Sequence, residues 1–565
     1  MSATTVDRFN PRPRGHEDHI HPEPEGFVRK YIFTIDHKII GIQYMITGLL
    51  FFVLSGLLAE VIRLQLLHPD GRLLSAQAYN GVYSVHGSAM VWLVIIPLVT
   101  GGFGNFVMPL MIGARDVAFP WLNMVSFWLF PPAGVMLFSS FLIGAPDAGW
   151  TEYPPVSLQG PPGTTLWCMA IFLIGISATM TGMNFMVTIV KMRAPGMTWT
   201  RMPLFVWATF ATAAMSMVAT VALSGALLAL FLERVFGVPF YDPARGGSPL
   251  LWQHMFWFYS HPAVYIMILP AFGIISEILP TFSRKPIFGY KMIAFSSLAI
   301  AVVGFMVWAH HMFTSGLAPW LQLPFMILTM LVAIPTGVKI FSWLATIWGG
   351  RLWFTTAMLF AVGFLATFTF GGITGVFLAS VPTDLHEHGT YFVVAHFHYV
   401  LFGGSVFGIF AGLYYWWPKM TGRMLSEKLG RWHFWTVFIG FNGTFLPMHW
   451  LGLMGMPRRV AVYDPQFQFW NVVASCFSFL MAISTLFLFY NMWWSLRKGR
   501  IAGNNPWGAR TLEWMISSPP PYYNFKTIPA VLKTPYSFNE PLPYLGLDDP
   551  PPNQMPTPMP ELLRS

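Results

Sequence analysis

Long apolar stretches constrain the fold of this chain more than any other feature. A helix needs about 20 mainly apolar residues to cross the hydrocarbon core of a bilayer, which is about 30 Å thick. About twelve stretches are long enough, at approximately 37–65, 83–112, 120–146, 165–190, 203–234, 251–280, 290–314, 320–348, 353–380, 390–417, 432–455 and 467–494. Membrane barrels use shorter strands in which polar and apolar residues alternate. The sequence therefore predicts an all-α integral membrane protein, a bundle of about twelve transmembrane helices.

The distribution of charge orients that bundle. Only 10% of the 565 residues are charged, which excludes a water-soluble globule because soluble domains carry about a quarter. If the N-terminus is cytoplasmic, 25 of the 32 Lys and Arg residues fall on the inner side and 6 on the outer side. This asymmetry follows the positive-inside rule, so the net charge of +9 needs no nucleic-acid partner to explain it.

The chain divides into three regions. Residues 1–36 form a polar segment without the apolar run of a cleaved signal peptide, residues 37–495 hold the predicted helices, and residues 496–565 form a proline-rich tail. We expect both terminal regions to be cytoplasmic and the tail to be extended or bound to a partner. Cys168 and Cys476 both fall in predicted helices, which excludes a disulfide framework and a CxxC site.

Histidines inside the predicted helices are informative because an ionisable group at the bilayer centre costs about 2.5–3.5 kcal/mol on insertion scales. In "AHFHYV", His396 and His398 are two residues apart, which separates them by about 200° on a helix. They therefore face two different groups and not one metal. His86, in "YSVHGSAM", has small neighbours that leave room for a planar macrocycle. The alternative is hydrogen bonding of each histidine to a neighbouring helix.

The adjacent pair His310 and His311, in "WAHHMF", would converge on one ion if the local helical turn is loosened. A third imidazole would complete a site suited to copper or zinc, and His261 is the best candidate. Pro262 interrupts the helical hydrogen bonding beside it, and Tyr265 lies one turn further on. An HH pair alone does not establish a metal site.

Lys339, in "AIPTGVKIFSW", is the one lysine well inside a predicted helix. Two interpretations are open. Its side chain either extends to the cytoplasmic interface, or it belongs with Thr336, one turn before it, to a polar file that carries protons inward.

Together these residues resemble subunit I of the haem–copper oxygen reductases, the cytochrome c oxidase family. The resemblance runs from "FTIDHKIIG" to about residue 495. It rests on motifs in a fixed order: "GGFGNFVMPLMIGARDVAFP", "WQHMFWFYSHPAVY", "VWAHHMF", "AIPTGVKIFSWLAT", "HGTYFVVAHFHYVL" and "GMPRR". It implies that the bundle encloses two haems and one copper.

The resemblance assigns metal ligands to the histidines. His86 and His398 would be the axial ligands of the low-spin haem a, and His396 the proximal ligand of the high-spin haem a3. The copper, known in the family as copper B, would be held by His261, His310 and His311.

Further positions would complete the centre. Tyr265, on the same helical face as His261, would be the catalytic tyrosine joined to a copper-ligand imidazole. Reduction of dioxygen to water needs four electrons. Haem iron and copper can supply three of them, and this phenol would supply the fourth. Cofactor contacts would come from Arg63 at a haem formyl group and from Trp150, Arg458 and Arg459 at the propionates.

The resemblance also implies two proton routes from the inner side. One ends at Tyr265 and comprises Thr336, Lys339 and Ser276. The other begins at Asp116 and comprises Asn105, Asn123, Ser177 and Asn184. Spacing alone also permits Asp116 to be a plain loop carboxylate beside Arg115.

This sequence departs from the better-known relatives two residues after His261. They carry a proton-passing glutamate where this chain has Ala263, whereas part of the family has Tyr and Ser before the histidine, here Tyr259 and Ser260. Tyr259 lies one turn before Ala263 on the same helical face. We expect it to relay protons by hydrogen-bonded transfer, because a phenol with a pKa of about 10 is a poor proton store.

Two metal sites of the family are altered. The His-Asp pair that binds magnesium at the interface with subunit II reads His388-Gly389 here, so His388 is a weak magnesium candidate, with Asp384, His386 and Glu387 nearby. Gln65 stands where the family has the acid of an outer calcium or sodium site.

The implied function is reduction of dioxygen to water, coupled to proton pumping across a bacterial inner membrane. Electrons would come from cytochrome c, free or as a fused or attached domain, through a dinuclear copper in subunit II. Subunit III, smaller subunits and a respiratory supercomplex are further candidate partners. Quinol-oxidising relatives carry an acid, a histidine and a glutamine where this chain has Leu67, Ala78 and Gly81. A transporter or non-catalytic haem-binding protein would not need the HH pair, Tyr265 and Lys339 together.

Overall fold

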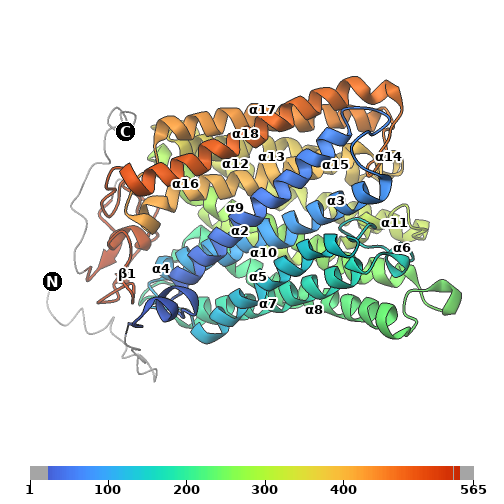
Figure 1. Cartoon of the computed structure of the whole chain (residues 1–565). Coiled ribbons are helices and arrows are strands. Elements are labelled where there is room, and N and C mark those ends of the chain that lie inside the picture. Colours follow the sequence, from blue (N-terminus) through green and yellow to red (C-terminus); the bar gives the residue numbers. More distant parts are fainter. Residues whose placement is uncertain (1–22, 539, 548–565) are drawn as a thin grey trace.

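The computed structural model describes residues 23–538 and 540–547. In this part of the chain, helices run side by side between two ends that carry the loops (Figure 1). The α-helices are α2 (His37–Gln65), α3 (Ala76–Ala89), α4 (Asn105–Ile112), α5 (Pro120–Ser139), α6 (Val156–Gln159), α7 (Gly163–Lys191), α8 (Leu204–Phe236), α9 (Pro249–Ser283), α10 (Tyr290–Gly304), α11 (Pro319–Leu331), α12 (Ala333–Ile347), α13 (Thr356–Ala379), α14 (Val381–Glu387), α15 (Tyr391–Val400), α16 (Phe407–Thr421), α17 (Glu427–Leu453) and α18 (Gln468–Lys498). Two short strands, β1 (Ala530–Val531) and β2 (Tyr544–Leu545), pair antiparallel.

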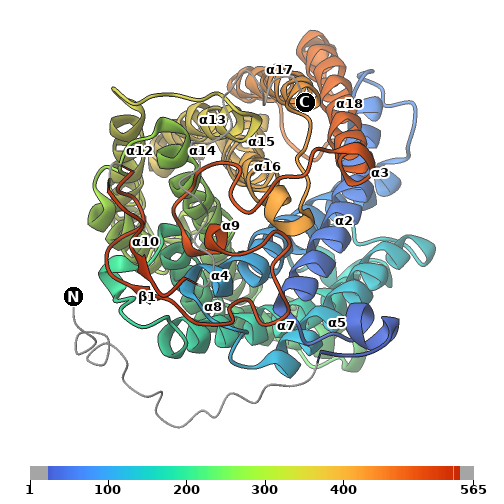
Figure 2. The same cartoon turned by 90° about the vertical axis from the view of Figure 1, so that its left-hand side faces the viewer.

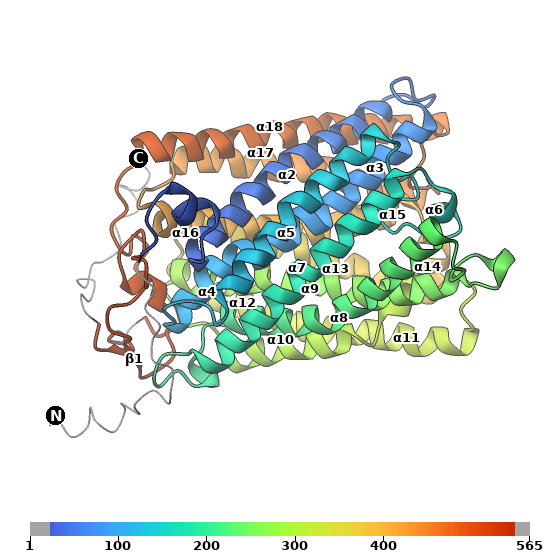
Figure 3. The same ribbon diagram turned by 60° about the horizontal axis from the view of Figure 1, so that its bottom comes forward.

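Two names describe the ends of the bundle. The tail end is the end on which residues 499–547 pack, and the roof is the opposite end, formed by the loops 66–75, 143–162, 237–248 and 454–464. Figure 3 shows the helices side by side, with α6 and α14 at the roof and β1 at the tail end.

Ten helical segments in the described residues are long and apolar enough to cross a membrane. Several of them join consecutive elements. The segment 76–112 combines α3, two π-helical stretches and α4, and the segment 391–421 combines α15, a π-helical stretch and α16. α10 is a shorter apolar helix, and α17 runs the length of the bundle beside α18. The chain is thus a multi-pass helical membrane protein.

Most helix boundaries follow from local sequence. Asp36, Ser75, Thr355, Thr390 and Ser426 each accept a hydrogen bond from a backbone N–H in the first turn of the helix that follows. A glycine with positive φ ends α4, α8 and α16, where only a residue without Cβ takes the left-handed conformation cheaply.

The predicted stretch 290–314 is not one helix. α10 ends at Gly304, and a 3-10 turn, Trp308–Met312, follows it. A Cβ atom on Gly304 would lie 2.7 Å from the Tyr265 ring, so this glycine lets the chain approach α9 closely. The prediction of a continuous span is wrong here because the chain leaves helical geometry where it meets Tyr265.

Burial identifies the centre of the bundle. In the most apolar window of α9, and in that of the segment 76–112, 89% of residues are buried, against 11% in the segment 319–347. α9 and α3–α4 are therefore central, whereas α11 and α12 lie at the outside of the bundle.

The proline-rich tail folds over the helix ends. Figure 2 looks onto this end and shows the tail lying across α4, α9 and α16. Trp507, Trp514 and Phe525 are buried. The ammonium group of Lys419 donates to the backbone carbonyls of Asn504, Ile516 and Ser517. Residues 499–547 are therefore packed against the bundle in this chain alone, and do not extend away from it.

Candidate metal centre

Three histidine side chains meet in the interior. His261 comes from α9, and His310 and His311 come from the 3-10 turn 308–312. His311 Nε2 lies 3.1 Å from His310 Nε2 and 3.2 Å from His261 Nδ1. One ring nitrogen from each histidine lies within 4.8 Å of the other two, and in the described residues no other group of three His, Cys, Asp or Glu side chains meets this condition.

This histidine cluster fits a metal ion. Imidazole nitrogens bound about 2.0 Å from one ion lie about 3 Å apart, which is the spacing found here. A set of three neutral imidazoles suits copper or zinc. The two adjacent histidines reach this point from a 3-10 turn, which is wound more tightly than an α-helix, and not from the loosened turn expected from the sequence.

Aromatic rings and one hydroxyl fix the cluster. The Tyr265 ring lies 4.7 Å from the His261 ring, at an interplanar angle of 70°. Trp257 stacks on His311 with ring centres 3.6 Å apart, and Thr329 Oγ1 lies 3.0 Å from His310 Nδ1. The phenol therefore stands directly beside the candidate metal position.

Three further histidines are held singly. The Nδ1 atom of His86 lies 2.8 Å from the Ser55 carbonyl oxygen, that of His396 lies 3.0 Å from the Gly371 carbonyl, and that of His398 lies 2.8 Å from the Val394 carbonyl. A carbonyl only accepts, so each Nδ1 carries the hydrogen and each Nε2 keeps its lone pair. Metal-binding histidines are typically oriented in this way by a hydrogen bond from the other ring nitrogen.

His396 and His398 face different helices. His396 Nδ1 also lies 3.1 Å from Thr374 Oγ1 of α13. His398 stacks on Phe445 of α17, with ring centres 4.1 Å apart. A Cβ atom on Gly375 would lie 2.9 Å from His396, so α13 needs a glycine at this position to let the ring in. The two rings thus address two separate groups.

Arginines lie toward the roof. Arg63 is buried and donates from Nε and Nη2 to Asn471 and Ser475, and Tyr391 is a further hydrogen-bonding neighbour. Burial and the adjacent charge of Arg459 lower the pKa of Arg458 to about 10. Within the described residues neither Arg458 nor Arg459 forms an ion pair with a carboxylate. This pair of guanidinium groups therefore fits an anionic group of a ligand.

Trp150 lies beside the same region. Its ring packs against Trp92 and Trp257, with ring centres 5.7 Å away in each case. A Cβ atom on Gly87, the neighbour of His86, would lie 3.1 Å from the Trp150 side chain. The loop that carries Trp150 thus covers the helix that carries His86.

His388 forms a two-residue contact. Its Nδ1 lies 2.9 Å from Asp384 Oδ2. No third His, Cys, Asp or Glu joins this pair among the described residues.

The residues of the Lys339 route do not contact one another directly. Lys339 is buried, and its ammonium group donates to Ser297 Oγ and the Ile293 carbonyl of α10. Ser276 Oγ accepts from Trp343 Nε1 and donates to the backbone of its own helix. Thr336 likewise donates to its own helix, at Val332. Lys339 is therefore held inside the bundle and does not extend to the surface.

The Asp116 route contains unpaired amides. Asp116 follows α4 at the tail end, where burial and the nearby charge of Asp36 raise its pKa to about 7. Asn105 Oδ1 and both polar atoms of the Asn123 side chain are buried without a hydrogen-bond partner. Such groups are normally satisfied by internal water. Further along, Ser177 Oγ lies 3.2 Å from the Tyr44 hydroxyl, whereas Asn184 bonds to the Phe119 backbone.

Tyr259 and Ser260 are both buried near the cluster. The Tyr259 hydroxyl accepts a hydrogen bond of 3.3 Å from Trp92 Nε1. Ser260 Oγ has no partner, so it too is placed to bond a water molecule.

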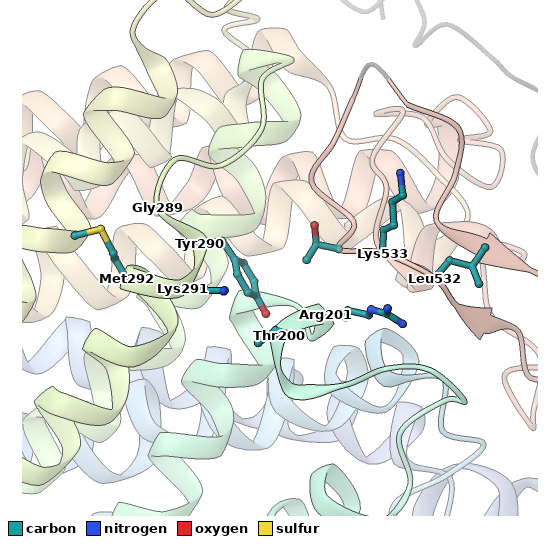
Figure 4. A pocket seen from close by; sticks show the side chains of 9 residues that line it. Thr200, Arg201, Gly289, Tyr290, Lys291, Met292, Leu532 and Lys533 are labelled. Carbon is teal, nitrogen blue, oxygen red and sulfur yellow. The ribbon is translucent and has the colours of Figure 1, made fainter. Parts of the chain in front are cut away.

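A surface pocket of about 630 Å³ is unrelated to this centre. It lies at the tail end, among Tyr290, Arg201, Lys291 and Lys533. Its cationic side chains stand apart in Figure 4. None of the histidines lines it.

Sequence reasoning missed several residues of the site. Trp257, Thr329, Thr374 and Ser297 touch the candidate groups through contacts that span 19 to 54 positions in the sequence. No local pattern marks these contacts. In contrast to these four residues, the unpaired Ser260 could be identified from the sequence, because it belongs to the Tyr-Ser pair before His261.

A helical membrane bundle that brings a histidine cluster beside a phenol, with three singly held histidines around it, is the architecture of a haem–copper oxidase. The chain belongs to this family: residues 39–480 match the model of "Cytochrome C and Quinol oxidase polypeptide I". It is 52% identical over 519 residues to "Cytochrome c oxidase subunit 1" of Thermostichus vulcanus, covering 92% of this chain and 94% of that protein. It is 49% identical over 506 residues to the protein of the same name from Bacillus subtilis, covering 89% and 81%.

A solved structure shows the same fold. It is titled "Cryo-EM structure of a heme-copper terminal oxidase dimer provides insights into its catalytic mechanism", and it aligns with a TM-score of 0.65 at 19% identity. The alignment covers 83% of this chain and 84% of that one.

Proposed function

We propose that this chain is the catalytic subunit of a terminal respiratory oxidase that reduces dioxygen to water with electrons from cytochrome c and couples this to proton pumping. The observation that carries the proposal is the meeting of His261, His310 and His311 beside the Tyr265 ring. Family membership over most of the chain supports it.

The histidines would hold the metals. His261, His310 and His311 hold a copper ion, His396 holds the iron of a high-spin haem a3, and His86 and His398 hold that of a low-spin haem a. When bound, the haems and the copper supply the electrons that dioxygen takes up. Hydrogen bonds at the second nitrogen orient His86, His310, His396 and His398, and stacking on Trp257 orients His311, so five of the six ligand rings would be oriented before the metals bind.

Tyr265 would supply one electron and one proton to the oxygen. Its ring lies 4.7 Å from His261, within the same water-poor interior. Arg458, Arg459 and Trp150 would hold the carboxylates of the haems, and Arg63 would bond the formyl group of the low-spin haem.

Protons would enter from the tail end by two routes. One passes Asp116, Asn105, Asn123 and Ser177, and water bonded to the unpaired amides connects these groups. Tyr259 and Ser260 relay the proton in the last part of this route, in place of a carboxylate. The other route runs through Thr336, Lys339 and Ser276 to Tyr265, and water molecules or side-chain movement bridge its gaps.

The tail end would face the cytoplasm and the roof the outer side of a bacterial inner membrane, as the distribution of Lys and Arg indicates. A separate subunit II with a dinuclear copper passes electrons from cytochrome c. Subunit III and smaller subunits complete the complex.

Oxygen consumption by the purified complex tests this function. With reduced cytochrome c as donor, we expect rapid consumption that cyanide abolishes and that a quinol does not support. Consumption with quinol alone would show the quinol-oxidising member of the family instead, and no consumption with either donor would contradict the proposal.

A further inference from the structure

Glu152 is a buried carboxyl group that the proposed route does not use. Its side chain has an exposed fraction of 0%. Neither Oε1 nor Oε2 has a hydrogen-bond partner of ordinary geometry, although the Ala148 N–H is close enough to favour the charged form slightly. Its φ angle of 41° lies in the left-handed region that favours glycine. A residue that is both strained and unsatisfied needs a reason to be there.

Glu233, a second buried acid at the roof, provides a comparison, because its hydrogen bonds are those of a carboxylate that stabilises the fold. Glu233 of α8 accepts hydrogen bonds from the backbone N–H groups of Phe240, Tyr241 and Asp242. It also lies 3.5 Å from Arg245. Glu152 has no such set of hydrogen bonds: the Ala148 N–H and the charges of Arg234 and Arg459 favour its charged form, but burial and the charge of Asp147 outweigh them.

The charged groups around Glu152 do not neutralise it. Those that affect it are Asp147, Arg234 and Arg459. The guanidinium group of Arg234 is bonded to the carbonyls of Ser157, Leu158, Gly160 and Pro161 and to the Thr165 hydroxyl. Tyr83 and Cys168 are the other titratable side chains in electrostatic reach. Burial and the charge of Asp147 together raise the pKa of Glu152 to about 8.

The position of Glu152 connects the histidine cluster with the outer side. Its neighbour Tyr153 accepts a hydrogen bond from Trp257 Nε1, and Trp257 stacks on His311. Thr151, on the other side, lies 3.5 Å from Arg459 Nη2. Asp147, in the same loop, is only half-buried. The residues on either side of Glu152 thus contact the surroundings of the histidine cluster and the arginine pair of the roof, and Glu152 itself lies within electrostatic reach of the half-buried Asp147.

We propose that Glu152 is a proton-carrying residue of the roof, which takes up a proton from the side of the histidine cluster and passes it toward Asp147 and the outer aqueous phase. The step moves a proton only: the carboxylate becomes a carboxylic acid and then a carboxylate again, and no electron or other reactant takes part. This inference rests on the proposed function, because the proton it carries is one that the oxidase pumps.

The test compares three variants of the whole complex in sealed vesicles. Glu152→Gln keeps the shape but cannot hold a transferable proton, Glu152→Asp keeps the acid, and Glu233→Gln removes a second buried acid of the roof. Proton release to the outside is measured after a pulse of reduced cytochrome c, and oxygen consumption is measured with the membrane uncoupled. Infrared difference spectra between pH 6 and pH 10 report the carbonyl band of a protonated carboxylic acid.

We expect Glu152→Gln to lose at least half of the pumped protons per electron while uncoupled oxygen consumption stays within about twofold of the wild type. Asp116 also titrates in this pH range, so each variant is compared with the wild type. The component of the carbonyl band that belongs to Glu152 should be present in the wild type, shifted in Glu152→Asp and missing from Glu152→Gln. Glu233→Gln should keep both the band and the pumping ratio.

Unchanged pumping and an unchanged carbonyl band in Glu152→Gln would overturn the proposal, as would equal loss of pumping in Glu233→Gln. Failure of the proposed function has a different signature. In that case the wild type itself consumes no oxygen with reduced cytochrome c, while the infrared band of Glu152 can still be measured.

Discussion

The six histidines of the centre form two groups that are built in opposite ways. In the cluster, the ring nitrogens of His261, His310 and His311 face one another at 3.1 to 3.2 Å. In the second group, His86, His396 and His398 each turn one nitrogen to a backbone carbonyl and keep the other apart from side chains of the protein. Three nitrogens that converge can surround one bare ion. A single nitrogen suits a metal whose other ligands come from a macrocycle that is already bound to it. Under the proposed function, the first group would hold copper and the second would hold the haem irons.

Removal of a singly held ligand should have the largest effect. His398→Ala leaves the low-spin haem without one axial nitrogen, and we expect loss of that haem's absorption and a fall in oxygen consumption of about a thousandfold or more. Visible spectra of the reduced complex provide the measurement. Retention of the low-spin haem in His398→Ala would contradict the assignment of His398 as a haem ligand, because this histidine would then be dispensable.

Proton supply should be separable from metal binding. Asp116→Asn should slow oxygen consumption by about a hundredfold without changing the haem spectra or the copper content. In the wild type, Asp116 has a pKa of about 7, so it is loaded with a proton below that pH and turnover should fall as the pH rises through it. Asp116→Asn should lack this step in a pH profile. An unaltered profile would contradict the assignment of Asp116 to the entrance.

The same shift affects stability. Between the ordinary value of 3.8 and about 7, the folded chain holds a proton on Asp116 that the unfolded chain has lost. The free energy of unfolding contributed by this group should therefore decrease as the pH rises across that range.

Tyr259 provides a sharper test of the relay. Tyr259→Phe removes the hydroxyl that Trp92 bonds but keeps the ring, and we expect oxygen consumption to fall by about tenfold and proton pumping to weaken. Full turnover with full pumping in this variant would show that Tyr259 packs the helix and carries no proton.

The smallest effect should come from the residues that orient the rings. Thr329→Val removes the hydroxyl beside His310 Nδ1 and should weaken copper affinity by about tenfold, measured by chelator competition. Thr374→Val should change the binding of haem to His396 less, because the Gly371 carbonyl still holds the same nitrogen. Equal effects of the two variants would remove the distinction drawn between the two groups.

The sequence predicted the parts of this centre that depend on local spacing. The separation of His396 and His398 by two residues places them on opposite helical faces, and the structure turns them to α13 and α17. Long apolar runs predicted the helices well, except where the chain stops being helical at Gly304 to meet Tyr265.

What the sequence could not predict depends on distant partners. The carbonyl that orients His86 belongs to Ser55, 31 residues away, and Lys339 bonds Ser297, 42 residues away. Such pairs follow from the packing of helices, which cannot be read from the local spacing of residues in one sequence. The folded tail was missed for the same reason, since its buried aromatic residues find their partners on helix ends far along the chain.

The copper content of His310→Ala tests the central claim most directly. Copper and haem are measured per chain in the purified complexes of the wild type and of this variant. The division into two groups predicts that His310→Ala loses one copper per chain and keeps both haems. Unchanged copper, or loss of a haem while copper is kept, would contradict the assignment of the histidine cluster to copper.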